Sequence, residues 1–186
     1  MDVLTDTRGR IRAEAVALFT ERGYATASLR EIADRVGITK ASLYYHYASK
    51  QDLLVAVVKP LMTDWREIVV AAEATPHTPA AVRAVLERCL DTMLAHRGVA
   101  NLFIRDAAAV VAALAPLIDD LMESSDRLRG WLAGPAPSPV DRVRAVAAIE
   151  LLGAALAAGT TLADVPDPVV RRTLLESAEL TLAGRR

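Results

Sequence analysis

Apolar residues recur every three or four positions along most of this chain, which is the spacing that places side chains on one face of an α-helix. The first such stretch runs from about Thr7 to Arg22 and is followed by a glycine. Its apolar stripe consists of Ile11, Ala15, Leu18 and Phe19. No segment alternates apolar and polar residues convincingly enough to indicate a strand. The pattern therefore predicts an all-α protein of about nine helices.

The next two predicted helices are short. Ser28 and Glu31 have the spacing of a capping box, in which each side chain bonds the backbone N–H of the other residue, so a helix begins there. Gly37 ends that helix because glycine tolerates the left-handed backbone of a C-terminal cap. Thr39 is a favourable N-cap for the helix that follows. Helix, glycine-containing turn and helix form the helix-turn-helix arrangement, whose second helix enters a DNA groove.

The second of these helices has a polar outer face. Leu43 and Tyr47 lie four residues apart and point inward, and no acidic residue occurs between Asp34 and Asp52. Hydroxyls, amines and small side chains on the other faces suit phosphate oxygens and base edges. These outer and flanking residues are Lys40, Ala41, Ser42, Tyr44, Tyr45 and His46. The alternative is an amphipathic helix whose tyrosines only cover a core.

Further residues around these helices form a recognisable set. It comprises Phe19, Gly23-Tyr24, Ser28-Leu29-Arg30-Glu31-Ile32-Ala33, Val36-Gly37-Ile38-Thr39, Ser42-Leu43-Tyr44, His46-Tyr47 and Ser49-Lys50-Gln51-Asp52-Leu53-Leu54. This set resembles the N-terminal DNA-binding module of the TetR family of transcriptional regulators, over about the first third of the chain. Beyond about residue 75 the resemblance is one of architecture alone.

The resemblance implies which residues contact the operator. These are Arg30, Thr39, Lys40, Ala41, Ser42, Tyr44, Tyr45, His46 and Lys50. Among them, Tyr44 and Lys50 are expected to hold phosphates. The family resemblance also implies repression as the default mode, released by a small molecule.

The remainder of the chain predicts a helical bundle. Helices are expected over about 50–74, 79–96, 99–114, 116–132, 139–162 and 167–183, with Pro60 kinking or restarting the first of them. Proline-rich breaks at 75–79 and 134–139 separate these helices. We expect residues 1–50 to form a helix-turn-helix DNA-binding domain and residues 51–186 a ligand-binding and dimerisation domain.

The last two predicted helices carry more apolar surface than one compact domain needs to bury. Pairing them with a second copy would form a four-helix interface, and by resemblance the family dimerises in this way. The expected interface residues are Ile149, Leu152, Leu156, Val170, Leu174, Leu175 and Ala178. A homodimer would place two reading helices about 34 Å apart on a palindromic site. The alternative is a monomer whose core these helices complete.

Large or pliable side chains on the middle helices could enclose a hydrophobic small molecule. The candidates are Met62, Trp65, Met93, Phe103, Met122 and Trp131, with His96 and Arg105 to orient a polar group. The alternatives are ordinary core for the apolar residues and a solvated pair for Arg105 and Asp106. A shift of the helix that begins near Lys50 would link ligand binding to DNA binding.

Composition fits this division. The chain has 186 residues, of which 53% are hydrophobic, and a net charge of −1. Residues 1–59 carry nine basic and seven acidic side chains, a charge of +2, against −3 for the rest. The single cysteine, Cys89, excludes an internal disulfide and lies in an apolar pattern as a buried residue, with a redox sensor as the alternative. The N-terminus lacks the apolar core of a signal peptide, so we expect a cytoplasmic protein without a membrane segment.

The sequence contains none of the motifs that would indicate an enzyme. His-Glu-x-x-His, a cysteine pair, a glycine-rich phosphate loop and Gly-x-Ser-x-Gly all fail to occur, so no catalysis, cofactor or metal is expected. The competing class is a helical ligand-binding or adaptor protein that does not bind DNA. The intact sequence from Thr39 to Lys50 favours the regulator.

Overall fold

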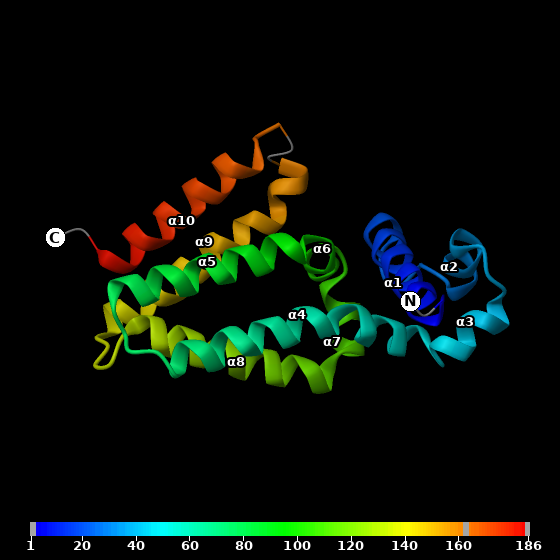
Figure 1. Ribbon diagram of the computed structural model, residues 1–186, viewed down its shortest axis with the longest axis horizontal. Helices are drawn as coiled ribbons and strands as arrows, with labels where there is room; N and C mark the ends of the chain where they lie inside the picture. Colours follow the sequence, from blue (N-terminus) through cyan, green and yellow to red (C-terminus); the bar gives the residue numbers. More distant parts are fainter. Residues whose placement is uncertain (1–2, 162–163, 185–186) are drawn as a thin grey trace. The chain divides into compact units, whose positions relative to one another are not determined.

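A computed structural model of the chain describes residues 3–161 and 164–184, with the side chains of residues 3–6, 100–101, 104–105, 116 and 156–161 left out. The described part contains ten helices and no strand, and Figure 1 shows these helices. They are α1 (Val3–Arg22), α2 (Leu29–Val36), α3 (Lys40–His46), α4 (Lys50–Glu73), α5 (Pro79–Ala95), α6 (Arg97–Arg105), α7 (Ala107–Ala113), α8 (Ala115–Ala133), α9 (Pro139–Thr161) and α10 (Asp167–Ala183). The predicted all-α fold is confirmed.

The chain folds into two compact units. The first unit combines Met1–Pro60 with Gly98–Ile118, and the second combines Leu61–Arg97 with Asp119–Arg186. α4 continues through Pro60 as one helix instead of restarting there. The predicted functional division after residue 50 stays a prediction.

The first unit begins with the predicted stripe of α1, in which Ile11, Ala15 and Phe19 are fully buried. The capping box of α2 forms as expected: the Glu31 N–H donates to Ser28 Oγ at 3.2 Å, and the Ser28 N–H donates to Glu31 Oε2 at 3.0 Å. Gly37 ends α2 in the left-handed region, at φ 75° and ψ 35°. Both glycine and capping residues therefore act where the sequence predicted them.

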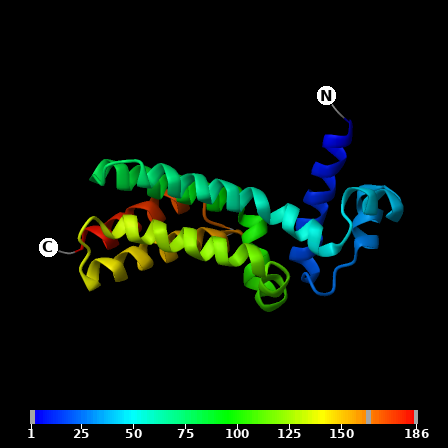
Figure 2. The ribbon, with the colours of Figure 1, turned by 90° about the horizontal axis from the view of Figure 1, so that it is seen from below.

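The second unit is a helical bundle. α5, α9 and α10 pack against one another, and α4 from Leu61 onward runs beside α8 in the same direction (Figures 1 and 2). Ion pairs join Arg66 to Asp120 and Glu73 to Arg127, seven residues apart on each helix. The buried core includes Trp65, Ile68, Leu86, Cys89, Leu90, Leu128, Leu152, Leu175 and Ala178. In the part of the chain that the structure describes, no helix is long and apolar enough to cross a membrane.

One predicted helix is two helices in the structure. The stretch expected over 99–114 breaks at Asp106, whose φ of −137° and ψ of 44° lie outside the helical region. The Asp106 carboxylate accepts a hydrogen bond from the Ala25 N–H at 2.8 Å. A contact between residues 81 positions apart therefore accompanies the break, and periodicity cannot reveal such a contact.

Five of the seven residues predicted for the dimer interface lie in the core of the second unit instead. Leu152 and Ala178 are completely buried, and Leu175 is 3% exposed. Ile149 and Val170 are also buried and Leu174 is half-buried, whereas the side chain of Leu156 lies outside the described residues. A side chain that its own chain already covers has no surface to offer a second copy. The interface prediction is therefore wrong for the five buried residues, whereas half-buried Leu174 stays a prediction.

The error has a physical cause. α9 and α10 are apolar on more than one face, and the sequence pattern did not separate the face that packs inward from the other. The large apolar side chains that remain exposed on these helices are different ones: Val140, Val143, Val146, Val169 and Leu180.

Candidate nucleic-acid interface

α3 is held in place by its two ends and by one buried face. The Ser42 N–H donates to the Thr39 hydroxyl at 3.1 Å, which caps the first turn. The Tyr47 N–H donates to the Leu43 carbonyl at 2.9 Å, which closes the last turn. Leu43 is fully buried and Tyr47 is 8% exposed. These two side chains point inward as predicted and orient the rest of the helix outward.

The outer face of α3 consists of Lys40, Ala41, Ser42, Tyr44 and Tyr45. Tyr45 is 80% exposed and Tyr44 44% exposed, Lys40 and Ala41 are exposed, and Ser42 is half-buried. The Lys40 ammonium lies 5.6 Å from the centroid of the Tyr44 ring. This face offers two phenol groups, one ammonium and one hydroxyl around a small alanine, so a groove edge could approach the helix closely.

Two basic side chains near this face remain uncompensated. Arg35 pairs with Glu21 and Arg22 pairs with Glu31. Among the described residues, neither Arg30 nor Lys40 forms an ion pair, and both are exposed. A phosphate is therefore an available partner for each of them.

Lys50 takes a place that differs from the predicted one. Its ammonium donates to the backbone carbonyls of Tyr24, Ala25 and Ala27, at 2.8, 3.0 and 3.0 Å. An ammonium group has three N–H donors, so these bonds use all of them. It also lies 4.7 Å from the centroid of the Tyr24 ring. While these contacts persist, Lys50 has no donor left for a phosphate, so its predicted role as a DNA contact is wrong.

His46 ends α3 in a half-buried position. Its ring meets the Tyr45 ring edge to face, with centroids 5.5 Å apart. Within the described residues its buried Nδ1 atom has no hydrogen-bond partner. The sequence placed His46 on the flank of the helix but could not show this packing.

The residues predicted for ligand binding do not form one group. Met62 and Trp65 are buried, and Met93, His96, Phe103 and Trp131 are half-buried. Met122 is 53% exposed, so its prediction as an interior residue is wrong: it lies on the solvent side of α8. The side chain of Arg105 lies outside the described residues. Phe103 belongs to the first unit and the other described members to the second.

Two of these residues have polar partners. The His96 Nε2 atom lies 2.7 Å from Asp64 Oδ2. The Trp131 indole N–H donates to the Thr75 carbonyl at 3.3 Å. By contrast, the buried Trp65 Nε1 has no partner in the described part of the chain. A buried donor without an acceptor is uncommon and marks a place where a ligand atom or a water can bind.

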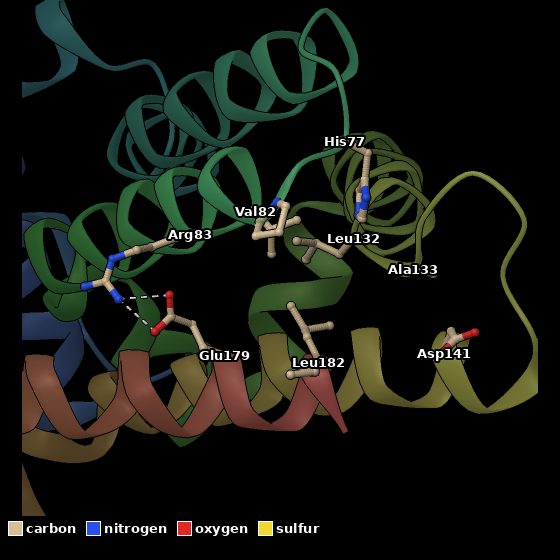
Figure 3. Close-up of a pocket in the computed structure, with 10 residues that line it drawn as sticks. His77, Val82, Arg83, Leu132, Ala133, Asp141, Glu179 and Leu182 are labelled. Carbon is tan, nitrogen blue, oxygen red and sulfur yellow. Dashed lines mark hydrogen bonds and ion pairs between the residues drawn. The ribbon is translucent and has the colours of Figure 1, made fainter. Parts of the chain in front are cut away.

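A cavity of about 440 Å³ lies elsewhere in the second unit (Figure 3). It is lined by His77, Pro79, Val82, Arg83, Leu132, Ala133, Asp141, Glu179, Leu182 and Ala183. On one side the Arg83 guanidinium donates to both oxygens of Glu179, at 2.9 and 2.8 Å. None of the predicted ligand-binding residues lines this cavity, and no sequence motif pointed to it.

The fold and the exposed face of α3 define a helix-turn-helix protein. Residues 11–57 match the family model described as bacterial regulatory proteins, tetR family. Residues 11–57 of this chain are therefore similar to this family of regulatory proteins.

Characterised relatives are similar in sequence to part of this chain. The transcriptional activator FasR of Mycolicibacterium smegmatis is 43% identical over 54 residues, which are 29% of this chain and 25% of FasR. The transcriptional repressor KstR2 of Mycobacterium tuberculosis is 40% identical over 58 residues, which are 31% of this chain and 28% of KstR2. The matched part thus spans only about a quarter of the length of these relatives.

Solved structures are similar over nearly the whole chain. AmtR of Mycobacterium smegmatis has a TM-score of 0.80 and 24% identity, with 96% of this chain and 87% of AmtR covered. KstR2 of Mycobacterium tuberculosis has a TM-score of 0.75 and 16% identity, with 95% and 93% covered. At these identities the likeness shows the fold, including that of the C-terminal helices.

Proposed function

We propose that this protein is a transcriptional regulator that binds duplex DNA by placing α3 in the major groove. The observation that carries the proposal is the outer face of α3, where Tyr45 is 80% exposed beside Lys40. Leu43 and Tyr47 anchor the opposite face, so the outer side chains face away from the protein. The match of residues 11–57 to a family of regulatory proteins supports the same function.

The proposed contacts follow from exposure and charge. Arg30 and Lys40 supply positive charge to phosphates, and Tyr44 supplies a hydroxyl to a phosphate. Thr39, Ala41, Ser42, Tyr45 and His46 complete the proposed DNA-binding set.

We propose that DNA binding represses transcription, because a protein seated on an operator blocks access to it. KstR2 is named as a repressor and FasR as an activator, and the sequence matches to them cover only 31% and 29% of this chain. The test uses a promoter that contains a DNA sequence to which the purified protein binds. On this promoter, the protein is expected to lower transcription in vitro. An increase in transcript would contradict repression.

The proposed effector is a small, largely hydrophobic molecule bound in the second unit. Met62 and Trp65 are each 6% exposed, and the unpartnered Trp65 indole N–H can donate to one polar atom of the ligand. We consider two conformations of the dimer: one in which the two copies of α3 are spaced to fit the operator, and one in which they are not. A ligand that binds the second conformation more tightly lowers DNA affinity by the ratio of its affinities for the two conformations. Native mass spectrometry of Trp65→Phe and of Trp131→Phe tests this: only the first is expected to lose a co-purified ligand, and equal retention would contradict the site.

The protein is proposed to act as a homodimer, since two copies of α3 on a palindromic site double the contacts. Its interface is proposed on the exposed faces of α9 and α10, where Val143 is 68% and Leu180 is 73% exposed. A helical adaptor without DNA binding remains the alternative function, and no catalytic role is proposed.

The test is selection of bound fragments from random duplex DNA, followed by binding measurements on the selected site. Lys40→Ala, Tyr44→Ala and Tyr45→Ala are each expected to weaken binding at unchanged helix content. Lys59→Ala is the matched control, because Lys59 is an exposed lysine of α4 outside the proposed DNA-binding set. Failure of the wild-type protein to enrich any sequence would favour the adaptor.

A further inference from the structure

The turn between α1 and α2, residues 23–27, is held by side chains from distant parts of the chain. Lys50 directs its ammonium at the carbonyls of Tyr24, Ala25 and Ala27, within 3.0 Å of each. Asp106 accepts from the N–H of Ala25 at 2.8 Å. Both polar groups of the Ala25 backbone are therefore bound, one by a cation and one by an anion.

The two anchoring side chains also influence each other. Burial lowers the pKa of Lys50, while the negative charge of Asp106 raises it. The carboxylate therefore favours the charged ammonium that the three carbonyls require. Removing either the Lys50 ammonium or the Asp106 carboxylate therefore weakens the hydrogen bonds of the other group to residues 23–27.

Asp106 is not the only link between residues 98–118 and the helix-turn-helix. At Gly98, an added Cβ would lie 3.0 Å from Val16 Cγ1, so the start of α6 packs tightly on α1. The Gln51 side-chain amide donates to the Ala113 carbonyl at 2.7 Å, which joins the start of α4 to the end of α7. The segment 98–118 thus touches α1, the turn and α4, and it belongs to the same compact unit.

The turn leads directly into the reading elements. Ser28, the N-cap of α2, follows Ala27, and α2 leads through Gly37 to α3. A change in the backbone of residues 23–27 therefore changes where α2 begins, and α2 and α3 pack against each other.

We propose that Asp106 is a positioning residue for DNA binding: by anchoring the turn at Ala25 together with Lys50, it makes the α6–α7 junction part of the reading unit. The proposal rests on the proposed function. It means that a conformational change at the α6–α7 junction that withdraws the carboxylate lowers DNA affinity, although Asp106 does not contact DNA.

The full-length variants Asp106→Ala and Asp106→Asn test the proposal, with Asp119→Asn as the control for charge on an exposed acid of α8. Three quantities are measured: hydrogen exchange of the Ala25 amide, the thermal midpoint, and affinity for a duplex that the wild-type protein has selected. Loss of a charge-assisted hydrogen bond predicts about tenfold weaker DNA binding for Asp106→Ala. Asp106→Asn keeps an acceptor oxygen and is expected to weaken binding by about threefold. Asp119→Asn is expected to match the wild type.

Together, the three measurements separate positioning from stability. A structural role alone would lower the thermal midpoint and leave the affinity of the folded protein unchanged well below that midpoint. Faster exchange at Ala25 with wild-type DNA affinity would therefore overturn the proposal. If Asp106→Ala does not fold, the DNA affinity of Asp106→Asn tests the proposal instead. Wild-type DNA affinity in Asp106→Asn would then overturn the proposal as well. Absence of DNA binding by the wild-type protein itself would overturn the proposed function instead.

Discussion

Cys89 shows how a residue's surroundings decide its chemistry. It is completely buried in the core of the second unit, and burial raises the pKa of its thiol to about 12. The neighbouring Arg88 lowers this pKa, but by less than burial raises it. Because the thiolate is the reactive form, the residue is expected to be inert in the folded protein.

Alkylation with iodoacetamide at pH 8 tests this expectation. The folded protein is expected to remain unmodified over a time in which the denatured protein reacts completely, as followed by intact mass. Modification of the folded protein at the rate of a free thiol would restore the redox-sensor interpretation.

The sequence does not predict the direction in which long, flexible side chains of the site point. Leu43 and Tyr47 point inward as predicted, because a helix of fixed pitch leaves their direction little choice. Lys50 stands at the expected position in the chain, but its flexible side chain turns to three backbone carbonyls. Met122 was expected inside and is exposed, since apolar character alone does not fix a face.

Capping carboxylates fix the starts of α2 and α9. Hydrogen bonds from Ser28 lower the pKa of Glu31, and hydrogen bonds from Ser138 lower the pKa of Asp141. The Arg127 side chain likewise lowers the pKa of Glu73 between α8 and α4. The first capping box was predicted, whereas the second, Ser138-Pro139-Val140-Asp141, carries the same spacing and was missed within a proline-rich break.

These carboxyl groups predict acid sensitivity. Each has a lower pKa in the folded chain than in the unfolded chain, so the unfolded chain binds more protons as the pH falls. Their stabilising effect is complete above the ordinary values of 4.5 for Glu and 3.8 for Asp and is lost below them. The thermal midpoint is expected to be nearly constant from pH 6 to pH 8 and to fall below about pH 4.5.

Glu31→Gln provides the check. It removes one titrating group, so its thermal midpoint is expected to be lower than that of the wild type at pH 7 and to approach it at pH 3. A constant difference between the two proteins at all pH values would contradict the contribution of Glu31.

α9 and α10 each have an inner and an outer apolar face. Substitutions on the inner face therefore test folding, and substitutions on the outer face test dimerisation. Leu180→Asp and Val143→Asp place a charge on the outer face and are expected to leave the chain folded while halving its mass in solution. Leu175→Asp places an unpaired charge in the core and is expected to destabilise the fold by roughly 3 kcal/mol or more. Light scattering and thermal unfolding measure the two effects.

Either of two results would count against this account of α9 and α10. An unchanged mass for both outer-face variants would remove the proposed interface. A folded Leu175→Asp monomer would place Leu175 at the interface after all, as the sequence pattern first suggested.

At the scale of the whole molecule, the first compact unit is discontinuous in sequence. The sequence identified its helix-turn-helix from local signals: the capping box, Gly37 and Thr39. It could not identify residues 98–118 as part of the same unit, because the contacts that join them, such as that between Ala25 and Asp106, are distant in the chain. The positions of the helices along the sequence therefore do not determine which helices belong to the same compact unit.

The central claim is that α3 binds the phosphate-lined groove of duplex DNA, and the salt dependence of binding tests it most directly. Fluorescence anisotropy with the selected duplex gives the slope of log affinity against log salt concentration. Each neutralised phosphate contributes about −0.9 to this slope, so we expect a steep negative slope that becomes shallower by about one in Lys40→Ala. A flat dependence, or the same slope in Lys40→Ala as in the wild type, would contradict the account.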